Sequence, residues 1–252
     1  MKIHQRENLQ ENLDIERLVE NPVEYLKELD ESGELQHVFP AFALTKGVWQ
    51  SLDKHKEGDA FVHTLMTLGE VYKESPSDKE FGKIEDPHDL LIIILALLYH
   101  DTGKRDRNLY DCPEKRVYHP NESVKHVNKE LAQYLSEEDL AIVAELVRKH
   151  DLITEILHIS KRANKLFKLF SISGNLGNSQ LLLKLSECDL RGREVSEEYA
   201  YFLPRNELLF ERNVELLKLL QAQEKQGQTF PLNSISRETR DRINELVDSL
   251  RK

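Results

Sequence analysis

Sulfur-containing residues and tryptophan are scarce in this 252-residue sequence, which holds two cysteines, two methionines and a single tryptophan. The two cysteines, Cys112 and Cys188, form no C-x-x-C motif. Neither a disulfide framework nor a cysteine zinc site is therefore expected. This cysteine usage is typical of proteins from a reducing compartment, so we expect a cytoplasmic protein.

Long apolar runs and an excess of positive charge are also missing. The longest apolar run, Leu90–Tyr99, has ten residues, about half of the roughly 20 needed to span a bilayer. The N-terminus, M-K-I-H-Q-R-E-N, has no apolar signal core. The net charge of -10 argues against a protein that coats nucleic acid, since such domains are basic. We expect neither a membrane nor bulk DNA as a partner, and nothing in the sequence indicates the oligomeric state.

Sustained strand-like alternation is absent, whereas apolar residues recur at helical spacing, so an all-α fold is expected. Asp59, Pro120, Ser136 and Ser179 each mark the start of a helix, and the helix after Pro120 is expected to reach about Leu135. Polar composition predicts a loop over 73–86 and a linker over about 221–230. We expect an N-terminal helical extension (1–52), a core (53–195) and C-terminal helices (196–252).

The stretch around which the chain is organised is L-L-I-I-I-L-A-L-L-Y-H-D-T-G-K, residues 90–104. Asp86 and Pro87 suit the start of a helix, and Gly103 suits its C′ position. A helix that is apolar all round is buried, so His100 and Asp101 are carried into a low-dielectric environment. Either a divalent cation compensates the carboxylate, or an Asp–His hydrogen bond simply stabilises the fold.

Histidine and aspartate recur at helix ends and on apolar stripes along the whole chain. His-Asp occurs three times, and His88-Asp89 is expected to lie on the surface, in the first turn of a helix. The remaining residues form an ordered series: His63, His100, Asp101, His119, His150 and Asp189. Each histidine alone could be structural, but together the imidazoles and carboxylates suit first-row divalent metals. Manganese, iron, nickel, cobalt, zinc and magnesium are not distinguished.

The motifs that carry this series resemble the HD superfamily of metal-dependent phosphohydrolases. K-E-G-D-A-F-V-H-T-L, L-L-Y-H-D-T-G-K, V-Y-H-P-N-E-S and S-E-C-D-L-R-G-R look like segments of the HD domain in bacterial CCA-adding tRNA nucleotidyltransferases. The resemblance covers about residues 17–195 and implies an HD-type helical bundle with extra N- and C-terminal helices. After His119, Pro120 and Asn121 stand where this family usually has an acidic residue. The chain is also too short to hold a nucleotidyltransferase head in addition. CCA addition is therefore not implied.

The resemblance also implies roles for the individual residues. His63, His100, Asp101 and Asp189 correspond to ligands of a first metal ion. His119 and His150 correspond to ligands of a second ion, with Asp101 bridging the two. Such a pair of ions activates a hydroxide and stabilises the entering and leaving oxygens at phosphorus.

Three basic residues near these ligands are candidates for binding the phosphate. Lys104 follows Asp101 by three residues and could neutralise a phosphate oxygen, in a catalytic as well as a substrate-binding role. Alternatively, its charge could simply interact favourably with the dipole at the C-terminal end of the helix. Arg191 and Arg193 could reach the substrate or be ordinary surface arginines.

The expected activity is that of a metal-dependent phosphodiesterase or phosphatase acting on a nucleotide or an RNA end, 2′,3′-cyclic phosphates included. A nucleoside monophosphate phosphatase is the alternative substrate class. A non-catalytic module that binds metal or RNA is the alternative kind of protein. P-loop, G-x-S-x-G and G-x-G-x-x-G motifs do not occur.

Overall fold

The computed structural model describes residues 13–52, 54–106, 119–151, 168–174, 176–199, 202–225 and 237–249. Within these ranges the chain is helical and forms no β-strand, apart from isolated bridges such as that between Trp49 and Asp59. The all-α expectation is confirmed. The helices are α1 (Ile15–Glu20), α2 (Pro22–Glu31), α3 (Leu35–Val38), α4 (Pro40–Ala43), α5 (Ala60–Leu68), α6 (Pro76–Phe81), α7 (Pro87–Tyr99), η1 (Thr102–Asp106), α8 (His119–Glu130), α9 (Glu137–Arg148), α12 (Ser179–Arg191), η2 (Glu197–Tyr199), α13 (Phe202–Lys225) and α14 (Arg237–Ser249).

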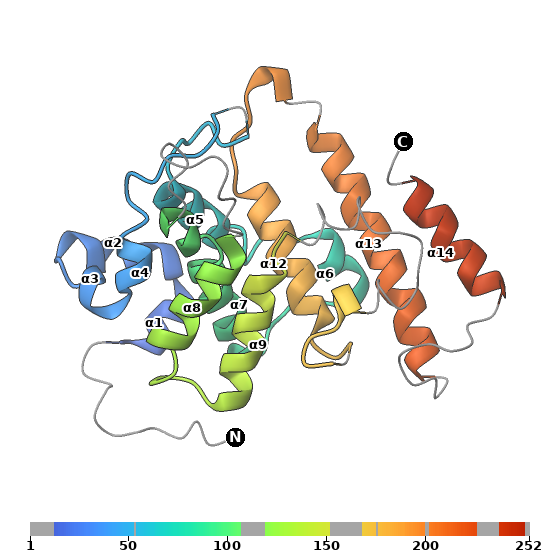
Figure 1. Ribbon diagram of the computed structural model, residues 1–252, viewed down its shortest axis with the longest axis horizontal. Coiled ribbons are helices and arrows are strands. Elements are labelled where there is room, and N and C mark those ends of the chain that lie inside the picture. Colours follow the sequence, from blue (N-terminus) through green and yellow to red (C-terminus); the bar gives the residue numbers. More distant parts are fainter. Residues whose placement is uncertain are drawn as a thin grey trace.

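Helix α7 is the centre of the fold, as its sequence predicts. Every residue from Leu91 to Tyr99 is buried. Helices α1, α5, α9 and α12 all pack against it, so its apolar surface contacts protein on every side (Figure 1). Asp86 accepts a hydrogen bond from the His88 N–H and so caps the first turn. The helix therefore delivers its last residues into the interior.

Helices from the two ends of the chain lie on opposite sides of α7 (Figure 1). The first helices pack on the core, α1 and α4 against α7 and α2 against α5. On the other side α13 packs against α6 and α12, and α14 packs against α13. None of the described helices is long and apolar enough to cross a membrane. The proposed division into three parts remains a prediction.

Three predicted boundaries are wrong. Helix α13 continues to Lys225, so residues 221–225 are not a linker, while 226–236 lie outside the described ranges. The predicted loop 73–86 contains helix α6, whose Ser75 and Asp78 form a capping box. The helix that begins at His119 ends at Glu130 instead of near Leu135.

Helix α6 is fixed by buried polar contacts that a local sequence pattern does not reveal. Lys184 of α12 pairs with Asp78 at 2.6 Å, and both side chains are almost fully buried. Glu187, one turn further along α12, accepts hydrogen bonds from the Ser77 N–H and hydroxyl at 3.1 and 2.6 Å. Because an unpaired buried charge is costly, these partners hold a short polar helix against the core.

Gly103 is required by close packing, not by the end of a helix. Helix α7 ends at Tyr99, and Gly103 lies in η1 with a backbone angle outside the left-handed region. A Cβ at this position would lie 2.2 Å from the His119 carbonyl oxygen and 2.6 Å from the Ser123 nitrogen. The expected C′ role of Gly103 is therefore wrong. The expected cap Ser179 is likewise the first residue of α12, after Asn178.

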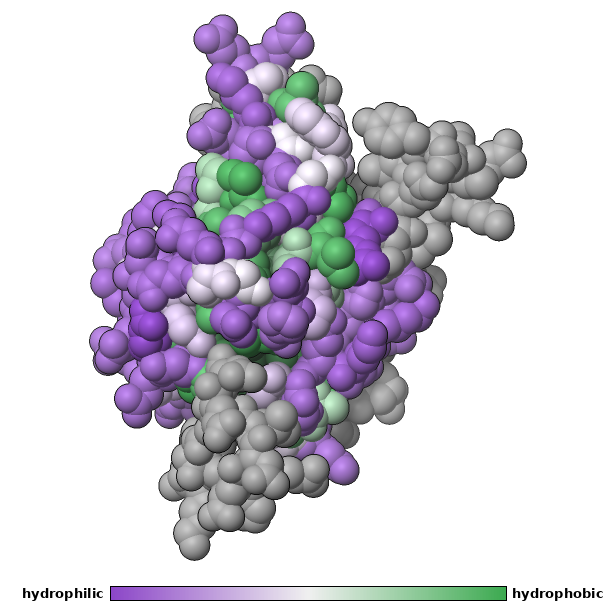
Figure 2. Space-filling view, turned by 90° about the vertical axis from the view of Figure 1, so that its left-hand side faces the viewer, coloured by the Kyte–Doolittle hydropathy of each residue, from purple (hydrophilic) through white to green (hydrophobic). Residues whose placement is uncertain are grey.

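The face formed by the first helices is mostly hydrophilic, with apolar side chains gathered near its middle (Figure 2). The exposed large apolar side chains of the described residues are Leu44, Trp49, Leu52, Val62, Tyr72 and Leu208. The His88 side chain is partly exposed, as expected of a position at the surface. Its Nε2 contacts the Asp139 carboxylate at 2.9 Å and so ties α7 to α9.

Candidate metal centre

Five separate parts of the chain bring the histidine and aspartate series to one place. His63 comes from the middle of α5, and the pair His100 and Asp101 follows the last turn of α7. The other three members begin α8, follow α9 and lie near the end of α12: His119, His150 and Asp189. All six are buried, with at most 9% of each residue exposed. Residues up to 126 positions apart in sequence thus share one interior site.

One half of the site joins α5, α7 and α12. The Nε2 of His63 lies 2.9 Å from Asp189 Oδ1. The Nε2 of His100 lies 3.7 Å from the same oxygen and 3.3 Å from Asp101 Oδ2. These nitrogen and oxygen atoms all point toward a common centre, so this half can hold one divalent cation.

The other half joins α7, α8 and the end of α9. The Nε2 of His119 lies 3.2 Å from Asp101 Oδ1, and the Nε2 of His150 lies 3.8 Å from it. The two Nε2 atoms are themselves 3.2 Å apart. Asp101 therefore turns one oxygen toward each half. That arrangement suits a carboxylate that bridges two cations.

Backbone carbonyl groups orient two of the imidazole rings. The Nδ1 of His100 donates to Leu97 O at 2.6 Å, and the Nδ1 of His150 donates to Val147 O at 2.8 Å. With its proton on Nδ1, each neutral ring presents the Nε2 lone pair to the site.

The atoms that face the centre lack the partners that burial demands. The Nε2 of His100 and the Oδ1 of Asp101 are buried without a hydrogen-bond partner. A lone pair that faces carboxylate oxygens is unfavourable unless a proton or a metal cation lies between them. The residues present therefore fit a divalent metal.

Electrostatics keep the two carboxylates ionised in the metal-free protein. Burial disfavours the charged form of Asp101, but His100 and Lys104 outweigh burial and hold the pKa of this carboxyl well below its ordinary value. Burial likewise opposes ionisation of Asp189, yet Arg193 and His63 hold its pKa well below the ordinary value. Deprotonated carboxylates are the form that binds metal, so the ligands are prepared for a cation.

The pKa values of His100 and His150 are shifted in opposite directions. Burial lowers the pKa of His100, but the neighbouring Asp101 and Asp189 outweigh it and raise that pKa overall. Burial, reinforced by the nearby His119 and His100, lowers the pKa of His150. His150 is thus biased toward the neutral imidazole, the form that coordinates a metal.

Two of the three predicted phosphate-binding residues lie at this site and contact its carboxylates. The Lys104 ammonium lies 2.6 Å from Asp101 Oδ2 and also pairs with Gln50. The Arg193 guanidinium donates to Asp189 Oδ1 at 2.8 Å. A metal in the first half would share these oxygens with the two cationic side chains, or displace them.

The third predicted residue, Arg191, is directed elsewhere. Its guanidinium forms a bidentate pair with Glu207 of α13 at 3.0–3.2 Å, and it donates to the Glu74 carbonyl at 2.8 Å. Residues two apart on a helix point to nearly opposite faces, whereas Arg193 follows Asp189 by four and shares its face. The contacts of Arg191 thus give no support to a substrate-binding role. The further basic residues Arg107, Lys115 and Arg116 lie outside the described residues.

Three further polar residues lie around the site that were not predicted from the sequence. Glu57 Oε1 lies 2.9 Å from His55 Nδ1 and 3.0 Å from His63 Nδ1. Asp151 Oδ1 lies 3.6 Å from His150 Nε2. The available signal was the pair His55-x-Glu57 just ahead of the His63 helix, together with the third His-Asp dipeptide.

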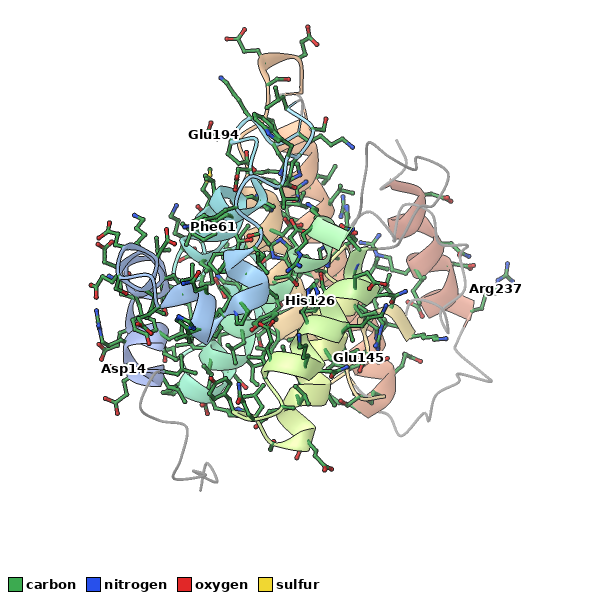
Figure 3. The ribbon with its side chains drawn as sticks, turned by 60° about the vertical axis from the view of Figure 1, so that its left-hand side comes forward. Asp14, Phe61, His126, Glu145, Glu194 and Arg237 are labelled. Carbon is green, nitrogen blue, oxygen red and sulfur yellow. The ribbon has the colours of Figure 1, made fainter. Side chains whose placement is uncertain are left out.

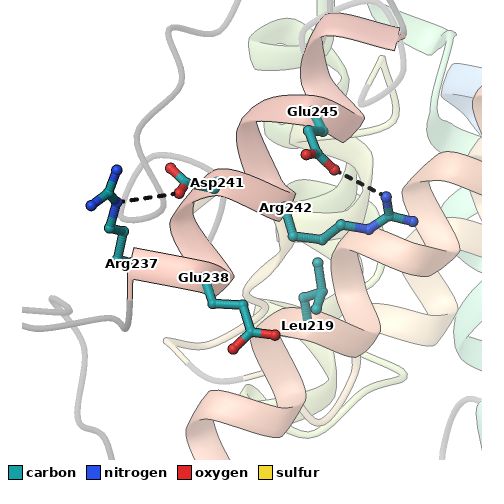
Figure 4. A pocket seen from close by; sticks show the side chains of 6 residues that line it. All are labelled: Leu219, Arg237, Glu238, Asp241, Arg242 and Glu245. Carbon is teal, nitrogen blue, oxygen red and sulfur yellow. Dashed lines mark hydrogen bonds and ion pairs between the residues drawn. The ribbon is translucent and has the colours of Figure 1, made fainter.

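A surface hollow of about 670 Å³ lies between α13 and α14 (Figure 4). It is lined by Leu219, Arg237, Glu238, Asp241, Arg242 and Glu245, and none of these belongs to the metal centre. Its arginines are paired with acidic residues, Arg237 with Asp241, and Arg242 with both Glu245 and Glu215 of α13. Within the described residues, this hollow is therefore separate from the buried histidine and aspartate cluster.

The fold and site together define an all-α protein with a buried cluster suited to a divalent metal. The chain is similar to proteins named "Multifunctional CCA protein" from Acinetobacter baumannii, among them those of strains AYE, SDF and ACICU. Each is 25% identical over 193 residues, which cover 73% of this chain and 42% of the relative. The chain thus spans less than half the length of these curated relatives. This likeness indicates a CCA-related origin. No family model and no solved structure matches the chain.

Proposed function

We propose that this protein is a metal-dependent phosphohydrolase of the HD type that hydrolyses a phosphoester of a nucleotide or an RNA end. One observation carries the proposal: the two oxygens of Asp101 face two separate groups of buried imidazoles, 3.2–3.8 Å away. A carboxylate shared in this way suits a two-metal centre, and two-metal centres are common in enzymes that cleave phosphoesters. The likeness to CCA proteins favours a nucleotide or RNA end as the substrate.

Each side chain of the centre has a task in this proposal. His63, His100 and Asp189 would hold one ion, His119 and His150 the other, and Asp101 would bridge them. Bound divalent metal would supply Lewis acidity, which lowers the pKa of a coordinated water and offsets negative charge at phosphorus. Arg193 holds the Asp189 carboxylate in place through its 2.8 Å hydrogen bond.

Lys104 is the side chain best placed to meet the phosphoryl group. Its ammonium contacts the Asp101 carboxylate from the edge of the site, and 19% of the side chain is exposed. An ammonium that already contacts a ligand of the centre needs only a small movement to reach a phosphate oxygen. A compact positive charge at that position would stabilise the transition state more than the ground state.

The experiment is a hydrolysis assay on protein that has been stripped of metal and reloaded with Mn²⁺, Co²⁺, Ni²⁺, Zn²⁺ or Mg²⁺. The substrates are 2′,3′-cyclic nucleotides, nucleoside monophosphates and an aryl phosphodiester. We expect turnover with at least one metal, loss of turnover on adding chelator, and background rates in Asp101→Asn. Equal rates in wild type and variant, or no turnover with any metal, would contradict the proposal and favour a non-catalytic binding module. A preference for monophosphates over cyclic phosphates would keep the enzyme and revise the substrate.

A further inference from the structure

Glu57 is a buried carboxylate with partners on both of its oxygens. Only 2% of its side chain is exposed. Oε1 accepts a hydrogen bond from His55 at 2.9 Å and lies 3.0 Å from the Nδ1 of His63. Oε2 accepts the Glu194 N–H at 3.0 Å. The carboxylate is thus held on the side of the His63 ring that faces away from the metal centre.

The backbone fixes Glu57 on the segment that follows α12. The Lys56 N–H donates to the Glu194 carbonyl at 2.7 Å, so the chain is tied there in both directions. Figure 3 labels Glu194 above Phe61, and Phe61 belongs to the same helix as His63. Because Arg193 precedes Glu194 and contacts Asp189, this tie also supports a second ligand of the centre.

The position of His63 within its helix explains why a side chain is needed there. His100 and His150 follow the ends of helices, and each donates its Nδ1–H to the free carbonyl three residues earlier. His63 lies inside α5, where the carbonyl three residues earlier, Ala60 O, already accepts from the Thr64 hydroxyl at 2.9 Å. Glu57 supplies the acceptor that the backbone of α5 does not.

We propose that Glu57 is a positioning residue that fixes the orientation and tautomer of His63, so that its Nε2 coordinates the metal of the first half. The inference rests on the proposed metal centre and extends it to a residue that is not itself a ligand. The His63 Nδ1 is buried without an aligned hydrogen bond, and Glu57 Oε1 is the carboxylate oxygen that lies 3.0 Å from it. A carboxylate on the far side of a ligating histidine increases its basicity and holds its tautomer.

The test is the variant Glu57→Gln, which keeps the size of the side chain and most of its packing. Glutamine has one acceptor oxygen where Glu57 uses two, so its NH₂ group must face either the histidines or the Glu194 N–H. An amide that donates to His63 Nδ1 would force the ring proton onto Nε2. We expect affinity for Zn²⁺, measured by competition with a chromophoric chelator, to fall about 10- to 100-fold.

Glu130→Gln is the matched control. The Glu130 carboxylate also accepts two hydrogen bonds, from the Ala41 N–H at 3.1 Å and the Tyr99 hydroxyl at 2.8 Å, but it contacts no residue of the centre. Its substitution should lower the unfolding temperature without weakening Zn²⁺ binding per folded molecule. If both variants weaken binding equally, the effect comes from lost stability, and the positioning role is refuted.

A second readout separates this inference from the proposed function. In ¹⁵N-labelled protein, the ring Nδ1–H resonance of His63, assigned by its loss in His63→Ala, should be protected from exchange in the wild type and lost in Glu57→Gln. This resonance can also be observed without metal. If the wild-type protein binds no Zn²⁺, the metal centre is therefore refuted, while the role of Glu57 can still be tested. An unchanged resonance would refute the role of Glu57. Loss of exactly one bound Zn²⁺ with the resonance intact would show that Glu57 is itself a ligand.

Discussion

At the scale of single residues, the two oxygens of Asp101 are the feature on which the site depends. Oδ2 contacts Lys104 at 2.6 Å and faces the first group of histidines, whereas Oδ1 faces His119 and His150. No other residue of the cluster is placed between the two halves in this way. Substitutions of Asp101 and of His119 should therefore have different consequences for metal binding.

We predict that Asp101→Asn loses metal from both halves, while His119→Gln loses metal from the second half only. The amide of asparagine carries no charge and offers one oxygen where Asp101 offers two, so neither half keeps its full set of ligands. Metal analysis of folded protein, after dialysis against each ion, measures the equivalents bound. The two halves are not separate if His119→Gln loses all metal. Asp101 is not the bridge if its variant keeps wild-type stoichiometry.

Most members of the buried cluster could be predicted from the sequence, because a polar residue in an apolar stretch is recognisable there. A charged aspartate is costly in an apolar environment unless it has a partner. Asp101 lies at the end of the apolar run, and Asp189 lies on an apolar stripe. The orienting groups are not recognisable in this way. The contacts of Glu57 with His63, and of Arg193 with Asp189, depend on how α5 and α12 meet, and no local pattern specifies that.

At the scale of elements, two glycines mark where the site-bearing segments approach most closely. A Cβ on Gly103 of η1 would lie 2.2 Å from the His119 carbonyl oxygen of α8. A Cβ on Gly192, which caps α12, would lie 2.5 Å from Thr67 of α5. In both places a side chain would push apart two elements that each carry or adjoin a ligand.

We predict that Gly103→Ala destabilises the protein by about 3 kcal/mol, the upper part of the range for overpacking a well-packed interior. Because His119 begins α8, separation of η1 from α8 should also weaken binding of the second metal. Urea unfolding and metal analysis measure the two effects. Gly69→Ala is the control, since its Cβ would meet nothing closer than 3.3 Å. Equal stability of the two variants would contradict the close approach.

The order and type of the helices could be predicted from the sequence more accurately than the residues at which the helices begin and end. Apolar spacing and the caps at Asp59, Asp86 and Ser136 predicted α5, α7 and α9, and all three caps accept the expected backbone hydrogen bonds. Helix α6 was missed because its short sequence is polar and is stabilised by buried partners on α12. The role of Gly103 was missed because close packing between distant segments has no local sequence signature.

At the scale of the whole molecule, burying the histidine cluster makes stability depend on pH. His55 shows this clearly, because it lies in the protein interior beside the centre and 11% of its side chain is exposed. Burial lowers the pKa of His55 from 6.5 to about 4, against the opposing hydrogen bond to Glu57 and with help from Arg193 and Lys104. The folded protein therefore binds a proton at this position less readily than the unfolded chain does.

The sign of the effect follows from that difference. With a folded pKa of about 4 and an unfolded value of 6.5, the unfolded state binds more protons between these values. The stabilisation from a neutral His55 is fully present above 6.5 and is lost as the pH falls through the window toward 4. At about pH 5 the loss amounts to roughly 2 kcal/mol, since one pKa unit corresponds to about 1.4 kcal/mol.

We predict that the metal-free wild-type protein loses about 2 kcal/mol more unfolding free energy than His55→Phe between about pH 7.5 and about pH 5. Phenylalanine fills a similar volume and does not titrate, so it removes the contribution of this residue while other groups titrate in both proteins. Urea unfolding at several pH values measures how the unfolding free energy of each protein changes with pH. A chelator is present so that metal binding does not add its own pH dependence. Parallel slopes would show that His55 titrates normally, and hence that water reaches the interior beside the centre.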